Sequence, residues 1–232
     1  MSDESSPESG RGSSHGLSGR RGHAKRNDEA ILTAARDVFV HDPGAPIAAV
    51  AGRAGVGISA LYRRYAGKED LLRQLCLSGL QRMILEAETV EAEPDGWSAL
   101  AGFLERVVDA DVHALTTRLA GAFTPTPELR ATAARADEVV ALLIARAHES
   151  GRLRADVVPE DVGLILEGCA AIRADDSLRT MQLRRRHLAL LLHGLSRVSG
   201  PDDAALPGPA PRPGELSRWL DETASDVNDG ER

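Results

Sequence analysis

The sequence predicts an all-α protein with a small helical unit at its N-terminus and a larger helical bundle after it. Only 3% of the 232 residues are aromatic. Ala, Leu and Arg are common instead, where an all-β sandwich or barrel would use aromatic and β-branched side chains. Apolar residues recur at helical spacing along most of the chain, and no segment of useful length alternates with the period of a strand.

The folded body is expected to span residues 25–199. Residues 1–24 are rich in Ser and Gly and offer almost nothing to bury, which predicts a disordered arm. Residues 200–232 begin with a Pro/Gly-rich linker that cannot hold a helix, which predicts a flexible tail. Cys76 and Cys169 form no CxxC pair, no signal peptide is visible and no segment approaches a membrane span. We therefore expect a soluble, cytoplasmic protein with no membrane partner.

Three helices are predicted in the N-terminal unit. The first follows Asn27, a plausible N-cap, and carries apolar residues at i, i+3, i+4, i+7 and i+8 before Asp42-Pro43-Gly44 stops it. A shorter helix repeats the pattern from Ile47 to Ala54. Gly55-Val56-Gly57 then makes a tight turn, and the third helix runs from Ile58 to Tyr65.

Five longer helices are predicted after this unit, separated by Pro- and Gly-containing breaks. They run from Lys68 to Glu91, Trp97 to Ala120, Glu128 to Ser150, Pro159 to Ile172 and Leu178 to Val198. In the third of them, the consecutive apolar residues Leu142, Leu143 and Ile144 follow Val139 and Val140. These residues cannot all lie on one face, which predicts that this helix is surrounded.

Charge is divided unevenly along the chain. The net charge is −7, which argues against indiscriminate binding of nucleic acid. Residues 20–73 nevertheless carry ten Lys/Arg against six Asp/Glu, whereas residues 76–232 carry seventeen against twenty-six. A basic N-terminal unit on an acidic body is the asymmetry expected when one end of a protein meets a polyanion.

The two short helices and the helix before them have the pattern of a helix-turn-helix unit. Ala51 lies where the two helices cross closely, and Gly55 lies where the turn needs a positive φ. An apolar plug between the helices is formed by Val50, Ala54, Val56 and Leu61. The second helix could then present side chains to a major groove. The alternative is a small helical hairpin that binds no nucleic acid.

Three runs of residues make this pattern more specific. They are Ile31-Leu32-x-Ala34-Ala35-x-x-Val38-Phe39, Val50-Ala51-x-x-Ala54-Gly55-Val56 and Leu61-Tyr62-x-x-Tyr65-x-x-Lys68-Glu69-x-Leu71-Leu72. Together they resemble the N-terminal domain of the TetR/AcrR family of transcriptional regulators. The rest of the chain resembles the family in length, helix count and order, and residues 151–161 are similar to a common C-terminal subclass of it.

The resemblance implies a DNA-binding domain over residues 25–73 and a helical effector-binding and dimerisation domain over residues 74–199. The implied function is that of a homodimeric repressor, released from a palindromic operator in double-stranded DNA by a small-molecule effector. The alternative is a regulator of the same fold that binds DNA or protein without an effector. No motif of an enzyme is present, so no catalytic residue, cofactor or metal site is expected.

The resemblance also implies roles in DNA binding. Tyr62 and Lys68 match positions that usually clamp backbone phosphates. Arg63 and Arg64 fall on the groove-facing side of the helix, as readers of guanine or as phosphate anchors. The basic residues at the end of the N-terminal arm could follow the DNA backbone or form a solvated tail. The predicted DNA-contacting residues are Lys25, Arg26, Gly57, Ser59, Ala60, Tyr62, Arg63, Arg64 and Lys68.

The chain departs from the family pattern beside and within the recognition helix. Gly57 stands where Ser or Thr usually caps this helix, and Pro46 stands where a Thr often caps the helix before it. Ile58 and Ala60 are apolar where polar contacts are common. The operator sequence therefore cannot be read from this chain.

Two functions are predicted for the apolar residues of the body. The last two helices carry stripes that fit either an intermolecular four-helix bundle, which the resemblance favours, or the core of one chain. The predicted dimer residues are Val162, Ile165, Leu166, Cys169, Leu188, Leu191 and Leu195. The candidate walls of an effector pocket, which could equally be plain core, are Trp97, Leu100, Phe103, Leu104, Val107, Phe123, Leu143 and Glu167.

Two charged clusters in the body receive ordinary explanations. Glu105, Asp109, Asp111 and His113 are close in sequence but fall on different helix faces, which indicates a solvated acidic face rather than a metal site. The basic run Arg184-Arg185-Arg186 is expected to be paired or solvated rather than to form a second site for nucleic acid.

Overall fold

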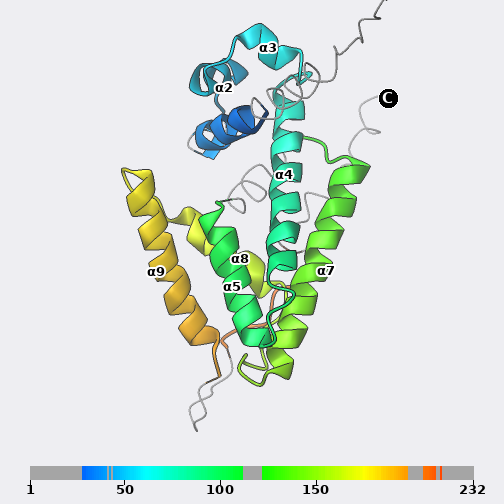
Figure 1. Ribbon diagram of the computed structural model, residues 1–232, viewed down its shortest axis with the longest axis vertical. Helices are drawn as coiled ribbons and strands as arrows, with labels where there is room; N and C mark the ends of the chain where they lie inside the picture. Colours follow the sequence, from blue (N-terminus) through cyan, green and yellow to red (C-terminus); the bar gives the residue numbers. More distant parts are fainter. Residues whose placement is uncertain are drawn as a thin grey trace, which may run out of the picture.

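The chain folds into a set of helices, seen in a computed structural model that describes residues 28–40, 42, 44–111, 122–197, 206–212 and 215. Residues 28–40 are helical and form the dark blue helix of Figure 1. The helices after it are α2 (Ile47–Ala54), α3 (Ile58–Tyr62), α4 (Lys68–Thr89), α5 (Gly96–Asp109), α7 (Pro127–Glu149), α8 (Asp161–Ala171) and α9 (Ser177–Leu195). Within the described ranges no strand occurs, and Leu153 and Ser196 form an isolated bridge. The all-α prediction is confirmed.

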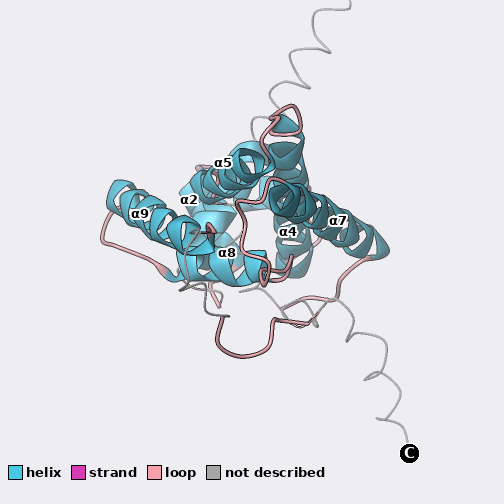
Figure 2. Ribbon diagram, turned by 90° about the horizontal axis from the view of Figure 1, so that it is seen from below, coloured by secondary structure: helices cyan, strands magenta, loops and turns pink. Residues whose placement is uncertain are grey.

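Helix α4 joins the two parts of the molecule. In Figure 1 it runs from the end that holds α2 and α3 into the body, where it lies beside α7. Its first half, including Leu71, Leu72 and Leu75, is buried in one apolar cluster with residues 28–40, α2 and α3. Its last turns contribute Ala87 to a second cluster, shared with α5, α7, α8 and α9. One rigid helix therefore belongs to both cores. Figure 2 shows α5 lying between α9 and the pair formed by α4 and α7.

Side-chain caps explain where several helices begin. The Asp95 carboxylate accepts a hydrogen bond from the Ser98 N–H at 3.0 Å and starts α5 one residue before the predicted Trp97. Thr126 caps α7 in the same way, with Pro127 in the first turn. Helix α8 begins at Asp161 rather than at Pro159, because the Asp161 carboxylate accepts from the N–H of Val158 at 2.8 Å and holds the intervening residues in a turn.

Helices α5 and α3 end well before the residues that the sequence predicts. Helix α5 ends at Asp109, whereas the prediction continued to Ala120, and residues 112–121 lie outside the described part of the chain. Helix α3 ends at Tyr62 and continues as a turn, in which the Tyr65 N–H still donates to the carbonyl of Leu61 at 2.9 Å. The recognition helix is therefore short.

Helix α7 is not surrounded, so that prediction is wrong. Val139, Val140, Leu143 and Ile144 are buried in the second cluster, whereas the side chain of Leu142 is 59% exposed. Helices α4 and α5 pack on one side of α7. Two neighbouring buried residues in each turn form an apolar face wide enough to cover that side, so the opposite side can stay exposed.

The stripes on α8 and α9 serve the core of the chain itself. Five of the predicted dimer residues are buried within the protomer, and Leu191 and Leu195 are half-buried against the same cluster. The five are Val162, Ile165, Leu166, Cys169 and Leu188. Because their side chains already lack solvent contact in the single chain, they have little area to offer to a second copy. Their role in a dimer stays a prediction. The two helices instead leave Leu164, Leu178 and Leu190 exposed.

None of the helices in the described ranges combines the length and apolar character needed to cross a membrane.

Candidate nucleic-acid interface

A glycine turn fixes the angle between α2 and α3. Gly55 has φ +67° and ψ +26°, the left-handed conformation that costs glycine least. Its N–H donates to the carbonyl of Gly52 at 3.2 Å, and the N–H of Val56 donates to the carbonyl of Ala51 at 3.0 Å. This pair of bonds is a Schellman motif, which ends α2 and turns the chain directly into α3.

The apolar plug below the turn is as predicted. Val50 and Leu61 are fully buried, and Ala54 and Val56 are half-buried against the same cluster. Ala51 is 3% exposed where α2 approaches α3, so a larger side chain would separate the helices. Helix α3 is thus anchored from below by Leu61, while most of its remaining side chains point away from the core.

The outer face of α3 lies at one end of the molecule, away from the body (Figure 1). Ser59, Tyr62 and Arg63 are exposed, and Tyr62 exposes 53% of its surface. Ile58 is 40% exposed and Ala60 is half-buried. This face carries a hydroxyl, a phenol and a guanidinium, which are donors suited to phosphate oxygens and base edges. The backbone of Gly57 is exposed just before it.

Two aspartates of the N-terminal helix hold arginines of the neighbouring helices. Arg64, directly after α3, forms an ion pair with Asp28 through both its Nε and Nη2 atoms. Arg53 of α2 pairs with Asp37, with 3.0 Å between Nη2 and Oδ2. Sequence reasoning missed these aspartates, because partners separated by 36 and 16 residues leave no local pattern. Arg64 is therefore a positioned side chain rather than a freely moving one.

Lys68 begins α4 next to the recognition helix. Its ammonium lies over the ring of Phe39, 5.2 Å from the centroid, and the residue is half-buried. The ring fixes the lysine at the first turn of a long helix, whose N–H groups also favour anions. Lys68 therefore places a positive charge at the N-terminus of α4, next to the carboxylates of Glu69 and Asp70.

Glu69 connects this end of α4 to the chain before α7. One of its oxygens accepts from the Thr124 N–H at 3.0 Å, while the Nε of Arg73 donates to the Thr124 carbonyl at 2.9 Å. The Thr124 hydrogen bond, followed by the charge of Arg73, lowers the pKa of the Glu69 carboxyl. Burial raises the pKa of the nearby Tyr65, so this phenol stays neutral beneath the interface.

Two family models match the chain over both of its parts. The model of bacterial regulatory proteins of the tetR family matches residues 31–75, and that of the SbtR-like transcriptional regulator C-terminal domain matches residues 95–197. Together they cover more than half of the chain. The chain belongs to the TetR family of transcriptional regulators. It is therefore a DNA-binding transcription regulator and not an enzyme.

Solved structures of other TetR regulators share its fold. The regulator SCO0520 from Streptomyces coelicolor is 24% identical, with a TM-score of 0.52 over 74% of this chain and 99% of that one. A TetR protein from Mycobacterium vanbaalenii is 24% identical, with a TM-score of 0.52 over 76% and 99%. LfrR from Mycobacterium smegmatis, in complex with proflavine, is 24% identical, with a TM-score of 0.53 over 72% and 96%. No curated protein sequence matches this TetR regulator.

Among the predicted DNA-contacting residues, the structure brings together those on α3 and at the start of α4. Gly57, Ser59, Ala60, Tyr62, Arg63 and Arg64 follow one another around α3, and Lys68 lies beside them in the chain. Lys25 and Arg26 lie outside the described residues. The assignment of individual contacts to DNA stays a prediction.

The predicted pocket walls of this TetR regulator are packed side chains. Six of them lie in the second apolar cluster and Phe123 lies in the first, all at 8% exposure or less, while Glu167 is half-buried. The six are Trp97, Leu100, Phe103, Leu104, Val107 and Leu143. A cavity of about 750 Å³ lies in another place, between the N-terminal helix and the start of α9.

The charged clusters of the body pair with each other. Arg185 binds Asp109 through two hydrogen bonds of 2.6 and 2.9 Å, and the buried Arg184 binds Asp111 at 2.5 Å. Arg184 also donates to the carbonyls of Ile172 and Ala170 near the end of α8. No metal-binding group of His, Cys, Asp or Glu occurs among the described residues, and His113 is not one of them.

Proposed function

We propose that this TetR regulator is a homodimeric repressor that binds a palindromic operator and is released from it by a small-molecule effector. One observation supports it most: a short helix, fixed by the Gly55 turn and anchored by Leu61, presents Ser59, Tyr62 and Arg63 at the end of the molecule. A rigid, donor-bearing helix that projects from the body is suited to a major groove.

The proposed contacts follow from exposure and position. Tyr62 and Lys68 bind backbone phosphates, because the phenol is exposed and the ammonium is held at a helix N-terminus. Arg63 reaches a base edge or a phosphate from the exposed face. Arg64, tied to Asp28, acts as a phosphate anchor beside it. Lys25 and Arg26 of the arm add salt-dependent affinity for the DNA backbone.

The dimer is proposed to form through the outer surfaces of α8 and α9. These helices expose Leu164, Leu178 and Leu190, at 46%, 59% and 63%. Large apolar side chains exposed on neighbouring helices lose unfavourable contact with water when a second copy covers them. A two-fold dimer also places two recognition helices about one DNA turn, roughly 34 Å, apart, as a palindrome requires.

Release by an effector is proposed to act through α4. The domain boundary proposed between residues 73 and 74 falls inside this helix, which shares its buried residues between both cores. A shift of the body therefore moves the recognition helix. A coupling of about 1–3 kcal/mol between effector and DNA is enough for regulation. The complex of LfrR with proflavine shows that a regulator of similar fold binds a small molecule.

A second candidate function is regulation without an effector in the body. The observation that favours it is the packing of the predicted walls, since Leu100, Phe103, Leu104 and Val107 are at most 1% exposed within one cluster. A panel of metabolites in the DNA-binding assay below separates the two candidates. A metabolite that weakens operator binding supports the repressor with an effector, and no response across the panel supports the second candidate.

The central test is a gel shift of the full-length protein with the intergenic DNA upstream of its own gene. Combined Tyr62→Phe and Lys68→Ala substitutions are expected to weaken binding at least ten-fold, because two phosphate contacts are lost. The control is Arg135→Gln, which removes one positive charge from an exposed ion pair on α7. Light scattering checks that all variants keep the same oligomeric state. Unchanged affinity of the double variant would remove the assignment of α3 as the reader of DNA.

A further inference from the structure

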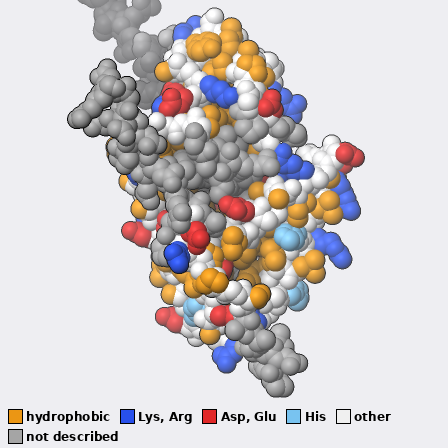
Figure 3. All heavy atoms as spheres, turned by 180° about the vertical axis from the view of Figure 1, so that it is seen from behind, with side chains coloured by type: hydrophobic (Ala, Val, Ile, Leu, Met, Phe, Trp, Pro, Cys, Tyr) orange, Lys and Arg blue, Asp and Glu red, His pale blue; other side chains and the backbone are white. Residues whose placement is uncertain are grey.

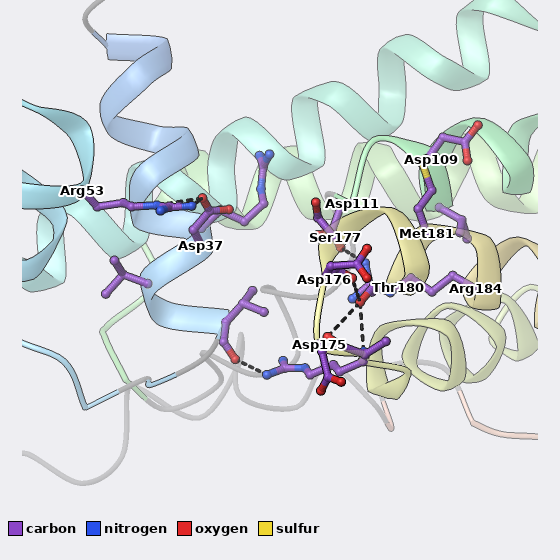
Figure 4. Close-up of a pocket in the computed structure, with 16 residues that line it drawn as sticks. Asp37, Arg53, Asp109, Asp111, Asp175, Asp176, Ser177, Thr180, Met181 and Arg184 are labelled. Atoms are coloured by element: carbon purple, nitrogen blue, oxygen red, sulfur yellow. Dashed lines mark hydrogen bonds and ion pairs between the residues drawn. The ribbon is translucent and has the colours of Figure 1, made fainter.

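The cavity of about 750 Å³ lies between the DNA-binding unit and the body. The N-terminal helix and α2 line it on one side, and the end of α5, residues 173–176 and the first turns of α9 line it on the other. Figure 4 shows Asp37 and Arg53 on the first side, facing Asp111, Thr180 and Arg184 across the space. Its volume is in the range of sites for small molecules.

Most charges around the cavity already have partners. Asp176 caps α9 by accepting from the Arg179 N–H, and Arg173 donates to the Val40 carbonyl at 2.5 Å across the boundary between the two parts. Further ion pairs beside the cavity join Arg53 to Asp37 at 3.0 Å, Arg184 to Asp111 at 2.5 Å and Arg185 to Asp109 at 2.6 Å. These pairs make the lining a fixed frame rather than a set of loose charges.

Arg36 differs from the other arginines of this lining. Its Nε atom is buried and has no hydrogen-bond partner. Burial lowers the pKa of the Arg36 guanidinium, and the charges of Asp111 and Asp37 oppose this only in part. A buried N–H without an acceptor is costly, and the group gains most from an acceptor that also carries negative charge. The side chain thus defines the kind of ligand that the cavity would favour.

We propose that this cavity binds a small organic monocarboxylate, and that the Arg36 side chain turns on binding so that its Nε–H, buried without the ligand, donates to the carboxylate. A planar carboxylate matches the guanidinium fork, so a second oxygen can bind a neighbouring nitrogen of the same group. A single negative charge fits better than a phosphate dianion or a dicarboxylate, because Asp175 and Asp176 also line the cavity and repel additional charge. The apolar part of the ligand lies along Val38, Val108 and Met181.

A ligand held here contacts both parts of the molecule. Arg36 belongs to the helix that packs beneath α3, whereas Thr180 and Met181 belong to α9. Binding itself does not require the chain to be a repressor. If the proposed function also holds, the carboxylate changes operator affinity, because it bridges the DNA-binding unit and the helix proposed for the dimer.

The test uses the full-length protein and sodium benzoate, with acetate, succinate and inorganic phosphate compared at equal ionic strength against chloride. Benzoate is expected to raise the midpoint of thermal unfolding in a saturable way, more than succinate or phosphate does. Arg36→Gln is expected to raise the dissociation constant for benzoate about ten-fold or more, and Arg36→Lys to raise it less. The matched control, Arg135→Gln, keeps the wild-type response.

A second measurement keeps the proposal testable if Arg36→Gln fails to fold. In ¹⁵N spectra of arginine side chains of the wild-type protein, the Nε–H signal of Arg36 is expected to shift saturably with benzoate. A benzoate response equal to that of chloride, or one unchanged by Arg36→Gln, would overturn the proposal. These outcomes involve no DNA, so they are independent of whether the operator test succeeds.

Discussion

The predicted site residues are exposed at the DNA-binding end and buried in the body. At the DNA-binding end, Tyr62 and Arg63 are exposed on a short helix above a small core. In the body, the predicted dimer residue Leu188 and the predicted pocket residue Phe103 are at most 1% exposed. A motif therefore predicts exposed residues well where it contains polar side chains that an apolar core would not bury. An apolar stripe does not show whether its partner belongs to the same chain.

The largest expected effect tests this difference on one helix. Leu188→Ala should lower the free energy of unfolding by about 2–5 kcal/mol, because a fully packed side chain is removed. Leu190→Ala removes the same atoms from a side chain that is 63% exposed. It should change the free energy of unfolding by about 0.5 kcal/mol or less. Urea denaturation of dilute protein measures both.

The same pair also locates the dimer contact. In sedimentation experiments at increasing concentration, Leu190→Ala is expected to weaken self-association, since its side chain lies on the proposed interface. Equal losses of stability for the two variants would mean that Leu190 is buried in the working molecule in the same way as Leu188. If only a folded Leu188→Ala variant associated more weakly, the dimer interface would instead include the apolar stripe of α8 and α9 to which Leu188 belongs.

A second prediction compares packing in the two regions through their glycines. A Cβ atom at Gly96, at the start of α5, would lie 2.0 Å from the carbonyl oxygen of Arg146 in α7. Gly96→Ala should therefore cost about 1–3 kcal/mol of unfolding free energy or more, because backbone has to move. At Gly52, inside α2, no atom lies within 4 Å of an added Cβ, and Gly52→Ala should stabilise by about 0.5–1 kcal/mol. Calorimetric unfolding of both variants gives the comparison. A tolerated Gly96→Ala would show that α5 and α7 can separate.

The sequence predicted the helices and the exposed outer face of α3 because these depend on local chemistry. The position of Gly55, the plug of Val50 and Leu61, and the helical spacing all act within a few residues. Helix ends were less predictable. Asp161 stopped α8 from starting at Pro159 through a side-chain bond that composition does not reveal.

The parts of the site that the sequence does not predict are those that depend on contacts between residues far apart in the chain. Asp28 and Arg64 are far apart in sequence, and Arg173 reaches Val40 across 133 residues. The sequence pattern places Asp111 on a solvated acidic face, whereas in the structure it binds a buried arginine. Such pairs follow from the tertiary packing of segments that are far apart in the sequence, so no spacing rule within a helix could have indicated them.

A third prediction concerns the ion pair that holds Arg64. Asp28→Asn removes a negative charge near the proposed interface and breaks the ion pair that holds Arg64. An exposed pair of this kind is worth about 0.2–1 kcal/mol, so operator affinity should rise by about five-fold or less. Fluorescence anisotropy at two salt concentrations measures the change, and Glu138→Gln on α7 is the control for net charge. A fall in affinity would mean that Asp28 is needed to aim Arg64, and that the arginine reads DNA only in that orientation.

The smallest expected effect concerns the missing cap of the recognition helix. Gly57 has φ −67° and ψ 139°, extended backbone that serine adopts freely, and an added Cβ there meets no atom within 4 Å. Gly57→Ser should raise the free energy of unfolding by about 0.2–0.5 kcal/mol, because the serine hydroxyl can accept a hydrogen bond from a backbone N–H in the first turn of α3. Gly55→Ser, two residues earlier, should instead destabilise by about 1–2 kcal/mol, because φ is +67° there. Thermal unfolding resolves the opposite signs. If both substitutions were neutral, the turn between α2 and α3 would not be rigid. A fixed angle between these two helices would then not explain how α3 is presented, which is the feature that distinguishes this end of the molecule from the body.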